Sequence, residues 1–141
     1  MATKAKTAAK KYKFSLKHFR EEDFKADGLR PYAEYRDLGV AAATGGDVQA
    51  HVIRHAVGFT PDKRQSPRHY HTVQFQMVYV MKGWIKTDFG KEGVHTMRAG
   101  ACFVQPSGLP HKVLDTSEDM ELLEIILPAQ FPTVDLEKKA P

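Results

Sequence analysis

Apolar and polar residues alternate over short stretches of this chain, which is the pattern of half-buried strands. In residues 48–56 the odd-numbered positions share one face of an extended strand and the even-numbered positions share the other. Turns rich in Gly, Pro or Asp separate the other expected strands, which are residues 31–39, 77–83, 84–89, 94–97, 101–105, 111–115 and 120–127. Short strands at regular intervals, with almost no helical periodicity, predict an all-β barrel or jelly roll.

The length of 141 residues suits one domain around one hydrophobic core. Residues 1–13 are expected to be a disordered basic tail, and residues 14–31 an N-terminal arm that packs over the barrel or a neighbouring subunit. Residues 32–131 are expected to form the barrel, and residues 132–141 a C-terminal tail. The hydrophobic share of 42% and the charged share of 27% are typical of a soluble globular protein.

The sequence favours a cytoplasmic location. No apolar run approaches the 18 or so residues that span a bilayer, and residues 1–13 lack the apolar segment of a secretory signal. Cys102 is the only cysteine, so no intramolecular disulfide can form. Because Cys102 lies in an apolar strand, we expect it to be buried as a small hydrophobic residue.

The net charge of +4 raises the question of a nucleic-acid partner. Residues 1–13 contain five lysines and no acidic residue, and the rest of the chain carries 16 basic against 17 acidic side chains. The basicity therefore belongs to the tail, and a solvated, disordered tail is a better interpretation than a phosphate-binding arm. We expect no nucleic-acid or membrane partner.

Three histidines are spaced as the ligands of one metal ion. His69 and His71 are two positions apart, so in a strand their side chains project from one face, about 7 Å apart along the chain. His111 follows the turn-forming sequence QPSGLP, as a ligand supplied by a separate strand would.

The surrounding residues resemble the cupin family, whose two motifs read G-x5-H-x-H-x3,4-E-x6-G and G-x5-P-x-G-x2-H-x3-N. Seven of the ten motif positions are matched, by His69, His71, Gly83, Gly100, Pro106, Gly108 and His111. Lys63 replaces the first Gly, Gln76 the Glu ligand and Asp115 the final Asn. The resemblance implies a single cupin barrel, a double-stranded β-helix, that holds a metal with His69, His71, Gln76 and His111.

Gln76 decides which chemistry we favour. A Gln oxygen is neutral, so the ion keeps its full charge and acts as a stronger Lewis acid. A higher oxidation state of the ion is also less stabilised than it would be by a Glu ligand. Cupins with three His and one Gln include enzymes that open unsaturated uronate rings and others that cyclise aromatic polyketides. Gln76 lies five positions after His71, so a bend between Thr72 and Phe75 is needed to bring both to one side. Gln76 could instead orient a metal-bound water.

The sequence thus predicts a metal-dependent isomerase, lyase or cyclase acting on a small polar molecule such as a sugar acid or a phenolic. An iron-dependent dioxygenase with the same ligands and a non-catalytic sensing cupin are the alternatives. The cofactor is one divalent transition metal ion, with Zn, Ni, Fe, Cu and Mn all suited to imidazole ligands.

Candidates for handling protons or substrate are weaker. His51 and His55 share a face of the strand at residues 48–56, and either could act as a base or bind an anion. Arg36 and Arg54 could pair with a carboxylate substrate, although arginines on barrel strands are usually solvated. A homodimer is expected, since the apolar residues of the arm need a surface to cover and sheet edges are usually shielded.

Overall fold

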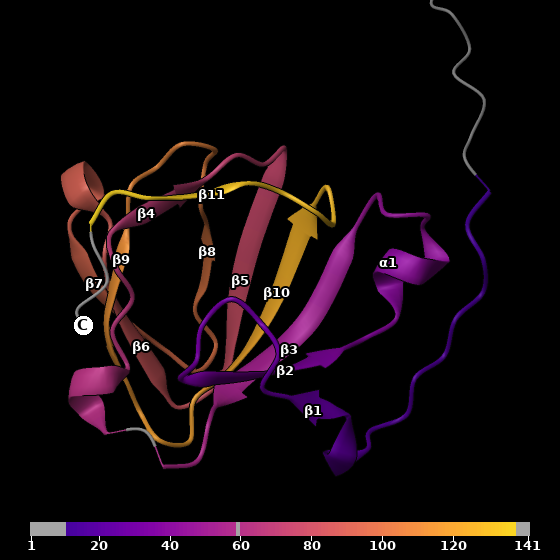
Figure 1. Cartoon of the computed structure of the whole chain (residues 1–141), viewed down its shortest axis with the longest axis horizontal. Coiled ribbons are helices and arrows are strands. Elements are labelled where there is room, and N and C mark those ends of the chain that lie inside the picture. Colours follow the sequence, from indigo (N-terminus) through magenta and orange to yellow (C-terminus); the bar gives the residue numbers. More distant parts are fainter. Residues whose placement is uncertain (1–10, 59, 138–141) are drawn as a thin grey trace, which may run out of the picture.

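The computed structural model describes residues 11–58 and 60–137, which form an antiparallel β-barrel (Figure 1). The strands are β1 (Phe24–Lys25), β2 (Ala33–Asp37), β3 (Gln49–His55), β4 (His69–His71), β5 (Phe75–Lys82), β6 (Trp84–Asp88), β7 (Val94–Arg98), β8 (Cys102–Val104), β9 (Lys112–Thr116), β10 (Glu121–Leu127) and β11 (Thr133–Asp135). One short helix, α1 (Val40–Ala43), and the 3-10 turns η1 (Glu21–Asp23), η2 (Pro61–Lys63) and η3 (Gly90–Glu92) lie between them. The predicted all-β barrel is confirmed.

Two walls make up the barrel. One is a six-stranded sheet in the order β1-β2-β3-β10-β5-β8, and the other combines the sheet β7-β6-β9 with the pair β11-β4. A β-bridge between His69 and His111 links β4 to the start of β9 and so joins the two parts of the second wall. Figure 1 shows the two walls facing each other, with β4, β6, β7, β9 and β11 opposite the larger sheet.

The alternating pattern of the sequence explains which side chains fill the barrel. In β5 the even-numbered Val78 and Val80 are buried, whereas Tyr79 and Met81 on the other face are exposed. These valines pack with Ile85, Met97, Met120 and Leu122 in the core. Beside this core lies a cavity that is lined by polar side chains together with core residues such as Val78 and Leu122.

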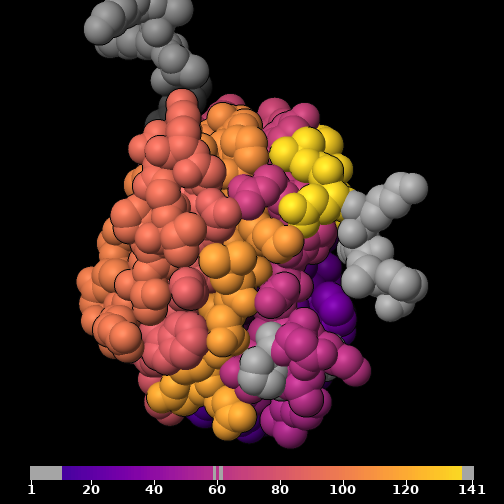
Figure 2. Space-filling model, turned by 90° about the vertical axis from the view of Figure 1, so that its left-hand side faces the viewer, coloured from indigo at the N-terminus to yellow at the C-terminus, as the bar shows by residue number. Residues whose placement is uncertain are grey.

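Both ends of the described chain contribute more to the barrel than the sequence indicated. In the predicted arm, β1 pairs with β2. In the predicted C-terminal tail, β11 pairs with β4, and Figure 2 shows this yellow segment lying against the magenta one. The short apolar–polar alternation of Thr133–Asp135 was too brief to distinguish from a tail. The basic tail lies largely outside the described residues, as do residues 138–141.

Residues 11–20 run as an extended segment outside the barrel (Figure 1). The segment is attached by the Lys13 N–H, which donates to the Ala43 carbonyl at 2.9 Å, and by the Tyr12 hydroxyl, which donates to Asp47 at 2.9 Å. Its apolar side chains are left in solvent, with Phe14 93% and Phe19 64% exposed. Within the described part of the chain, no helix is long and apolar enough to cross a membrane.

Candidate metal centre

Three buried histidines converge on one point of the barrel interior. His69 and His71 lie on the same face of β4, and backbone hydrogen bonds pair His69 with His111 in both directions, at 2.9 and 2.8 Å. The ring centroids are 4.2 Å apart for His69 and His111 and 4.8 Å apart for His69 and His71. One ring nitrogen from each residue lies within 4.8 Å of those of the other two. The alternation along β4 and the bridge to His111 therefore gather the triad.

The turn before His111 fixes its approach to β4. Gly108 adopts a positive φ of 80°, which favours glycine, and its N–H donates to the His71 carbonyl at 2.9 Å. Ser107 also binds this strand region, because its hydroxyl accepts the Val73 N–H at 3.0 Å. The turn-forming residues that precede His111 thus position the third imidazole beside the first two.

The hydrogen bonds of the triad leave one nitrogen of each ring for a metal. The Nδ1 partners are the Pro67 carbonyl for His69 (2.7 Å), the Leu109 carbonyl for His111 (2.9 Å) and the Thr133 hydroxyl for His71 (2.8 Å). A carbonyl oxygen only accepts, so His69 and His111 carry their proton on Nδ1, and Nε2 presents a lone pair. Such partners orient a ligating imidazole and fix its tautomer.

Burial keeps these imidazoles neutral. It lowers the pKa of His69 to about 3 and that of His71 to about 4, with the neighbouring His111 as the second cause in both cases. The pKa of His111 is also lowered, again mainly by burial. A neutral imidazole is the form that binds a metal, so the triad is in its ligating form at neutral pH.

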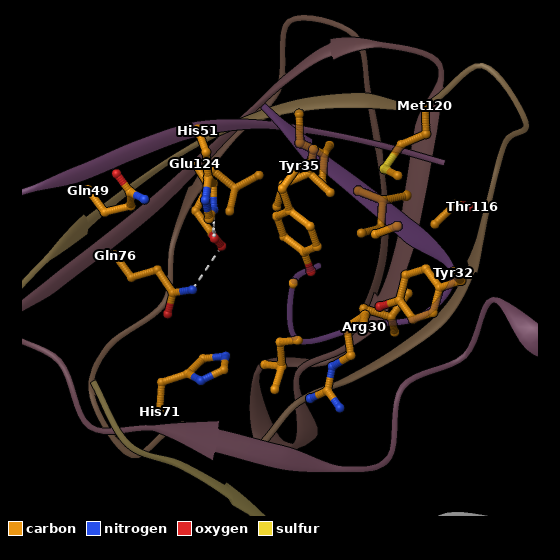
Figure 3. A pocket seen from close by; sticks show the side chains of 18 of the residues that line it. Arg30, Tyr32, Tyr35, Gln49, His51, His71, Gln76, Thr116, Met120 and Glu124 are labelled. Atoms are coloured by element: carbon orange, nitrogen blue, oxygen red, sulfur yellow. Dashed lines mark hydrogen bonds and ion pairs between the residues drawn. The ribbon is translucent and has the colours of Figure 1, made fainter. Parts of the chain in front are cut away.

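Gln76 lines the same cavity. The chain leaves the strand conformation between His71 and Phe75, so the expected bend is present and β5 restarts with Gln76 facing inwards. The Gln76 Nε2 donates to Glu124 Oε2 at 3.0 Å, which leaves the amide oxygen on the other side of the group. Figure 3 shows this oxygen directed to the side of the cavity where His71 lies. The fold places Gln76 as a fourth, neutral oxygen donor would be placed.

Glu124 and His51 form a partly buried acid–base pair, of which the sequence pointed only to His51. The register of β3 and β10 sets them directly opposite each other, and His51 Nε2 lies 2.7 Å from Glu124 Oε1. Desolvation raises the pKa of Glu124, but hydrogen bonds from His51 and Gln76 and the charge of His51 outweigh it, so the net pKa is lowered. Glu124 is therefore ionised at neutral pH, next to the candidate ligand Gln76.

These side chains surround a cavity of about 380 Å³. Besides the triad, Gln76, His51 and Glu124, its walls include Arg30, Tyr32 and Tyr35, which come from the segment before β2 and from β2 itself (Figure 3). Burial raises the pKa of Tyr35 to about 12, so its hydroxyl keeps its proton at neutral pH. The volume suits a small organic molecule.

The other predicted residues lie away from this cavity. His55 is not among the residues that line the cavity. The pKa of His55 is lowered, first by burial and second by the positive charge of Arg64. Arg54 pairs with Glu34 at 2.8 Å on the outer surface, and the guanidinium of Arg36 lies 5.3 Å from the centroid of the exposed Phe19 ring. The expectation that Cys102 is buried is wrong: it is exposed, because β8 is the edge strand of the six-stranded sheet.

The donor set fits a divalent transition metal. Three neutral imidazole nitrogens and one amide oxygen are ligand types that such ions accept, and each imidazole is oriented by its own partner. Within the described residues, the triad is the group of His, Cys, Asp and Glu side chains close enough together to hold an ion.

Comparisons with known proteins agree with this architecture. The family model described as a cupin domain matches residues 56–126. A search of curated protein sequences gives no significant match.

Solved structures with similar folds have different activities. The polyketide cyclase RemF from Streptomyces resistomycificus is 18% identical, with a TM-score of 0.68 and coverage of 89% of this chain and 88% of that one. KdgF from a Halomonas species is 17% identical, with a TM-score of 0.61 and coverage of 83% and 96%. A salicylate 1,2-dioxygenase from Pseudoaminobacter salicylatoxidans is 12% identical, with a TM-score of 0.59 and coverage of 78% and 31%. At these identities the likeness concerns the fold.

The buried triad predicts how the stability of the metal-free protein depends on pH. In the unfolded chain an imidazole takes up a proton near pH 6.5, whereas in the folded protein His69 and His71 do so only at about 3 and about 4. Between those values the unfolded state binds more protons, so the free energy of unfolding falls as the pH falls. The loss is up to about 1.4 kcal/mol per pH unit for each histidine. Urea unfolding of chelator-treated protein from pH 7 to 5 measures it.

Matched histidine variants identify the source of this slope. His69→Gln is expected to reduce the change of the free energy of unfolding with pH by the contribution of one histidine. His95→Gln, at an exposed position, is the control and is expected to leave this change as it is in the wild type. A free energy of unfolding that does not change between pH 7 and 5 would contradict the burial of neutral imidazoles.

Proposed function

The chain belongs to the cupin family, and on that premise we propose that it is a metal-dependent enzyme with non-redox chemistry. The reaction is of isomerase, lyase or cyclase type, and the substrate is a small polar organic molecule such as a sugar acid or a phenolic. One divalent transition metal ion is the cofactor, held by His69, His71, His111 and Gln76.

The observation that carries this proposal is a neutral donor set beside an ionised, hydrogen-bonded carboxylate. Because His69, His71, His111 and Gln76 are neutral ligands, a divalent ion held by them would keep its full charge and would supply Lewis-acid polarisation of a substrate oxygen. Gln76 connects the two parts, because its oxygen faces the triad side while its nitrogen holds Glu124 at 3.0 Å. The site thus pairs an electrophile with a base, as proton abstraction next to a carbonyl or hydroxyl requires.

Glu124 and His51 handle the proton in this scheme. Glu124 is ionised and accepts a proton from the substrate, and His51, with Nε2 at 2.7 Å from Glu124 Oε1, stabilises the carboxylate form until Glu124 gives the proton back. In an isomerisation the proton returns to a neighbouring atom of the substrate, and in an elimination or cyclisation it leaves with the departing hydroxyl group. Tyr35, whose ring centroid lies 5.2 Å from that of His51, lines the cavity beside the pair.

The two alternatives predict different behaviour. A dioxygenase requires iron and consumes oxygen, and the salicylate 1,2-dioxygenase shares only the fold with this chain. A sensing cupin binds its ligand whether or not the metal is present. The neutral Gln76 and the partly buried His51–Glu124 pair favour the non-redox enzyme, because neither oxygen activation nor passive binding needs a base beside the ligands.

Glu124→Gln is the variant that tests the proposed base. It keeps the shape of the side chain and removes the negative charge, so turnover is expected to fall about 100-fold or more while the metal stays bound. Purified protein is first analysed for metal content and then screened by mass spectrometry against sugar acids and phenolics, with oxygen uptake recorded in parallel. Glu118→Gln is the matched control, since the Glu118 side chain is 86% exposed.

Loss of metal on chelation without loss of turnover would contradict the proposal, as would full activity of Glu124→Gln. Iron-dependent oxygen uptake with substrate would establish the dioxygenase instead. Ligand binding that persists after chelation and in His111→Ala, without product, would establish the sensing role.

We also propose that the protein acts as a homodimer in the cytoplasm, without a nucleic-acid partner. The dimer is supported by the extended segment at residues 11–20, whose Phe14 and Phe19 are exposed by 93% and 64% on one copy. The location is supported by the single cysteine, and the missing nucleic-acid partner by the near-neutral charge of the chain beyond residues 1–13.

Sedimentation velocity at micromolar concentration tests the dimer. The wild type is expected to sediment as a dimer, and Phe14→Ser combined with Phe19→Ser to shift it towards monomer, because the arm then loses the apolar groups that a second copy covers. Val57→Ser removes an equally exposed apolar group elsewhere and is expected to change nothing. A wild type that is monomeric throughout would refute the proposal.

A further inference from the structure

Arg30 is a buried cation on the wall of the cavity. Arg30 lies in the connection between β1 and β2, and only 7% of its surface is exposed. It lines the same cavity as the histidine triad. In Figure 3 its guanidinium reaches to the side of the cavity where His71 lies, across from the Gln76–Glu124 pair. A charged side chain buried to this extent needs partners that repay its desolvation.

The described residues do not supply such partners in full. The Nη2 atom of Arg30 is buried and has no hydrogen-bond partner among them. The nearest carboxylate in ion-pair range is Asp135, whose Oδ1 is 3.8 Å from Nη2, too far for a hydrogen bond. Asp135 also lies at the rim, with its side chain 37% exposed. Arg30 therefore keeps a strong donor unsatisfied beside the cavity.

The remaining acidic groups of the cavity are otherwise engaged or lie at its mouth. Both oxygens of Glu124 are taken, one by His51 and one by Gln76. Asp23, Asp27 and Asp37 line the cavity only from the partly or fully exposed segments around β1 and β2. The positive charge of Arg30 also acts on the histidine triad. Burial is the main cause that lowers the pKa of the three histidines, and the charge of Arg30 is one of the smaller causes.

We propose that Arg30 binds a carboxylate of the substrate, so that the substrates of this site are organic acids. The inference rests on the proposed function and narrows its substrate class. A guanidinium recognises a planar carboxylate through paired, charge-assisted hydrogen bonds, and the ligand supplies the partner that Nη2 lacks. Anchored there, an acid presents its neighbouring oxygen-bearing carbons to the triad and to the Glu124–His51 pair.

Among molecules small enough for the cavity, Arg30 would favour those that carry a carboxylate. Sugar acids and phenolic acids carry the required group, whereas neutral sugars and simple phenols leave Arg30 buried and unpaired, a penalty that disfavours them. Arg30 is a binding residue in this scheme and takes no part in proton transfer, because a guanidinium does not lose its proton in proteins.

Calorimetric titration with matched probes tests the assignment. Galacturonate is compared with its methyl ester, and salicylate with salicylamide, on zinc-loaded and on chelator-treated protein. The wild type is expected to bind at least one acid about 10-fold or more tightly than its neutral partner, a preference that charge-assisted hydrogen bonds support. Arg30→Gln should abolish the preference in both metal states, and Arg30→Lys should retain part of it. Arg98→Gln, at an exposed position, is the charge-matched control.

The outcomes separate this inference from the proposed function. If zinc binds with the full triad but neither acid is preferred, or if Arg30→Gln keeps the preference, the carboxylate role is overturned and the metal enzyme stands. If the wild type binds no zinc while the Arg30-dependent preference remains, the metal chemistry fails and the carboxylate site stands. A purely structural role predicts that Arg30→Gln and Asp135→Asn lower the melting temperature equally and leave the preference intact, which would also overturn the assignment.

Discussion

The pairing of His69 with His111 is the interaction on which the rest of the site depends. Two backbone hydrogen bonds, at 2.9 and 2.8 Å, join β4 to the start of β9 and at the same time bring the ring centroids of two imidazoles to 4.2 Å from each other. The same bridge closes the smaller wall of the barrel. Closure of the fold therefore also brings together the histidines of the candidate metal centre. Because the imidazoles are buried, they remain neutral, and their Nδ1 partners turn the other nitrogen of each ring towards a common point.

A second polar layer runs along the inner face of the six-stranded sheet, across the neighbouring strands β5, β10 and β3. Gln76 stands between the triad and Glu124, and Glu124 joins it to His51 through hydrogen bonds of 3.0 and 2.7 Å. Every member of this layer has a partner, which is the condition under which buried polar groups are tolerated. Arg30 differs, because its Nη2 has none among the described residues. The interior is thus polar and ordered on one side of the cavity and incompletely satisfied on the other, where a ligand can bind.

Alternation along short stretches predicted the barrel, and local spacing placed His69 and His71 on one face, whereas the resemblance to the cupin motifs added the distant His111. Alternation in residues 48–56 set the faces of β3, and the parity between His71 and Gln76 required the bend that the structure has. Glu124 was not found, because a glutamate that alternates with leucine and isoleucine also fits a solvated position. Only the placement of β10 between β3 and β5 makes its face an inner one. Arg30 lies in a segment without periodicity, so its burial depends on long-range packing that spacing does not encode.

The proposed chemistry requires that the three imidazoles and the Gln76 oxygen bind one ion together. X-ray absorption spectroscopy on the protein loaded with a single equivalent of zinc tests this most directly, and a Gln76→Leu variant isolates the fourth ligand. The account predicts the multiple-scattering signature of three imidazoles with an additional oxygen shell, and a weaker oxygen shell in the variant. A spectrum with fewer than three imidazoles, or with sulfur from Cys102, would contradict it.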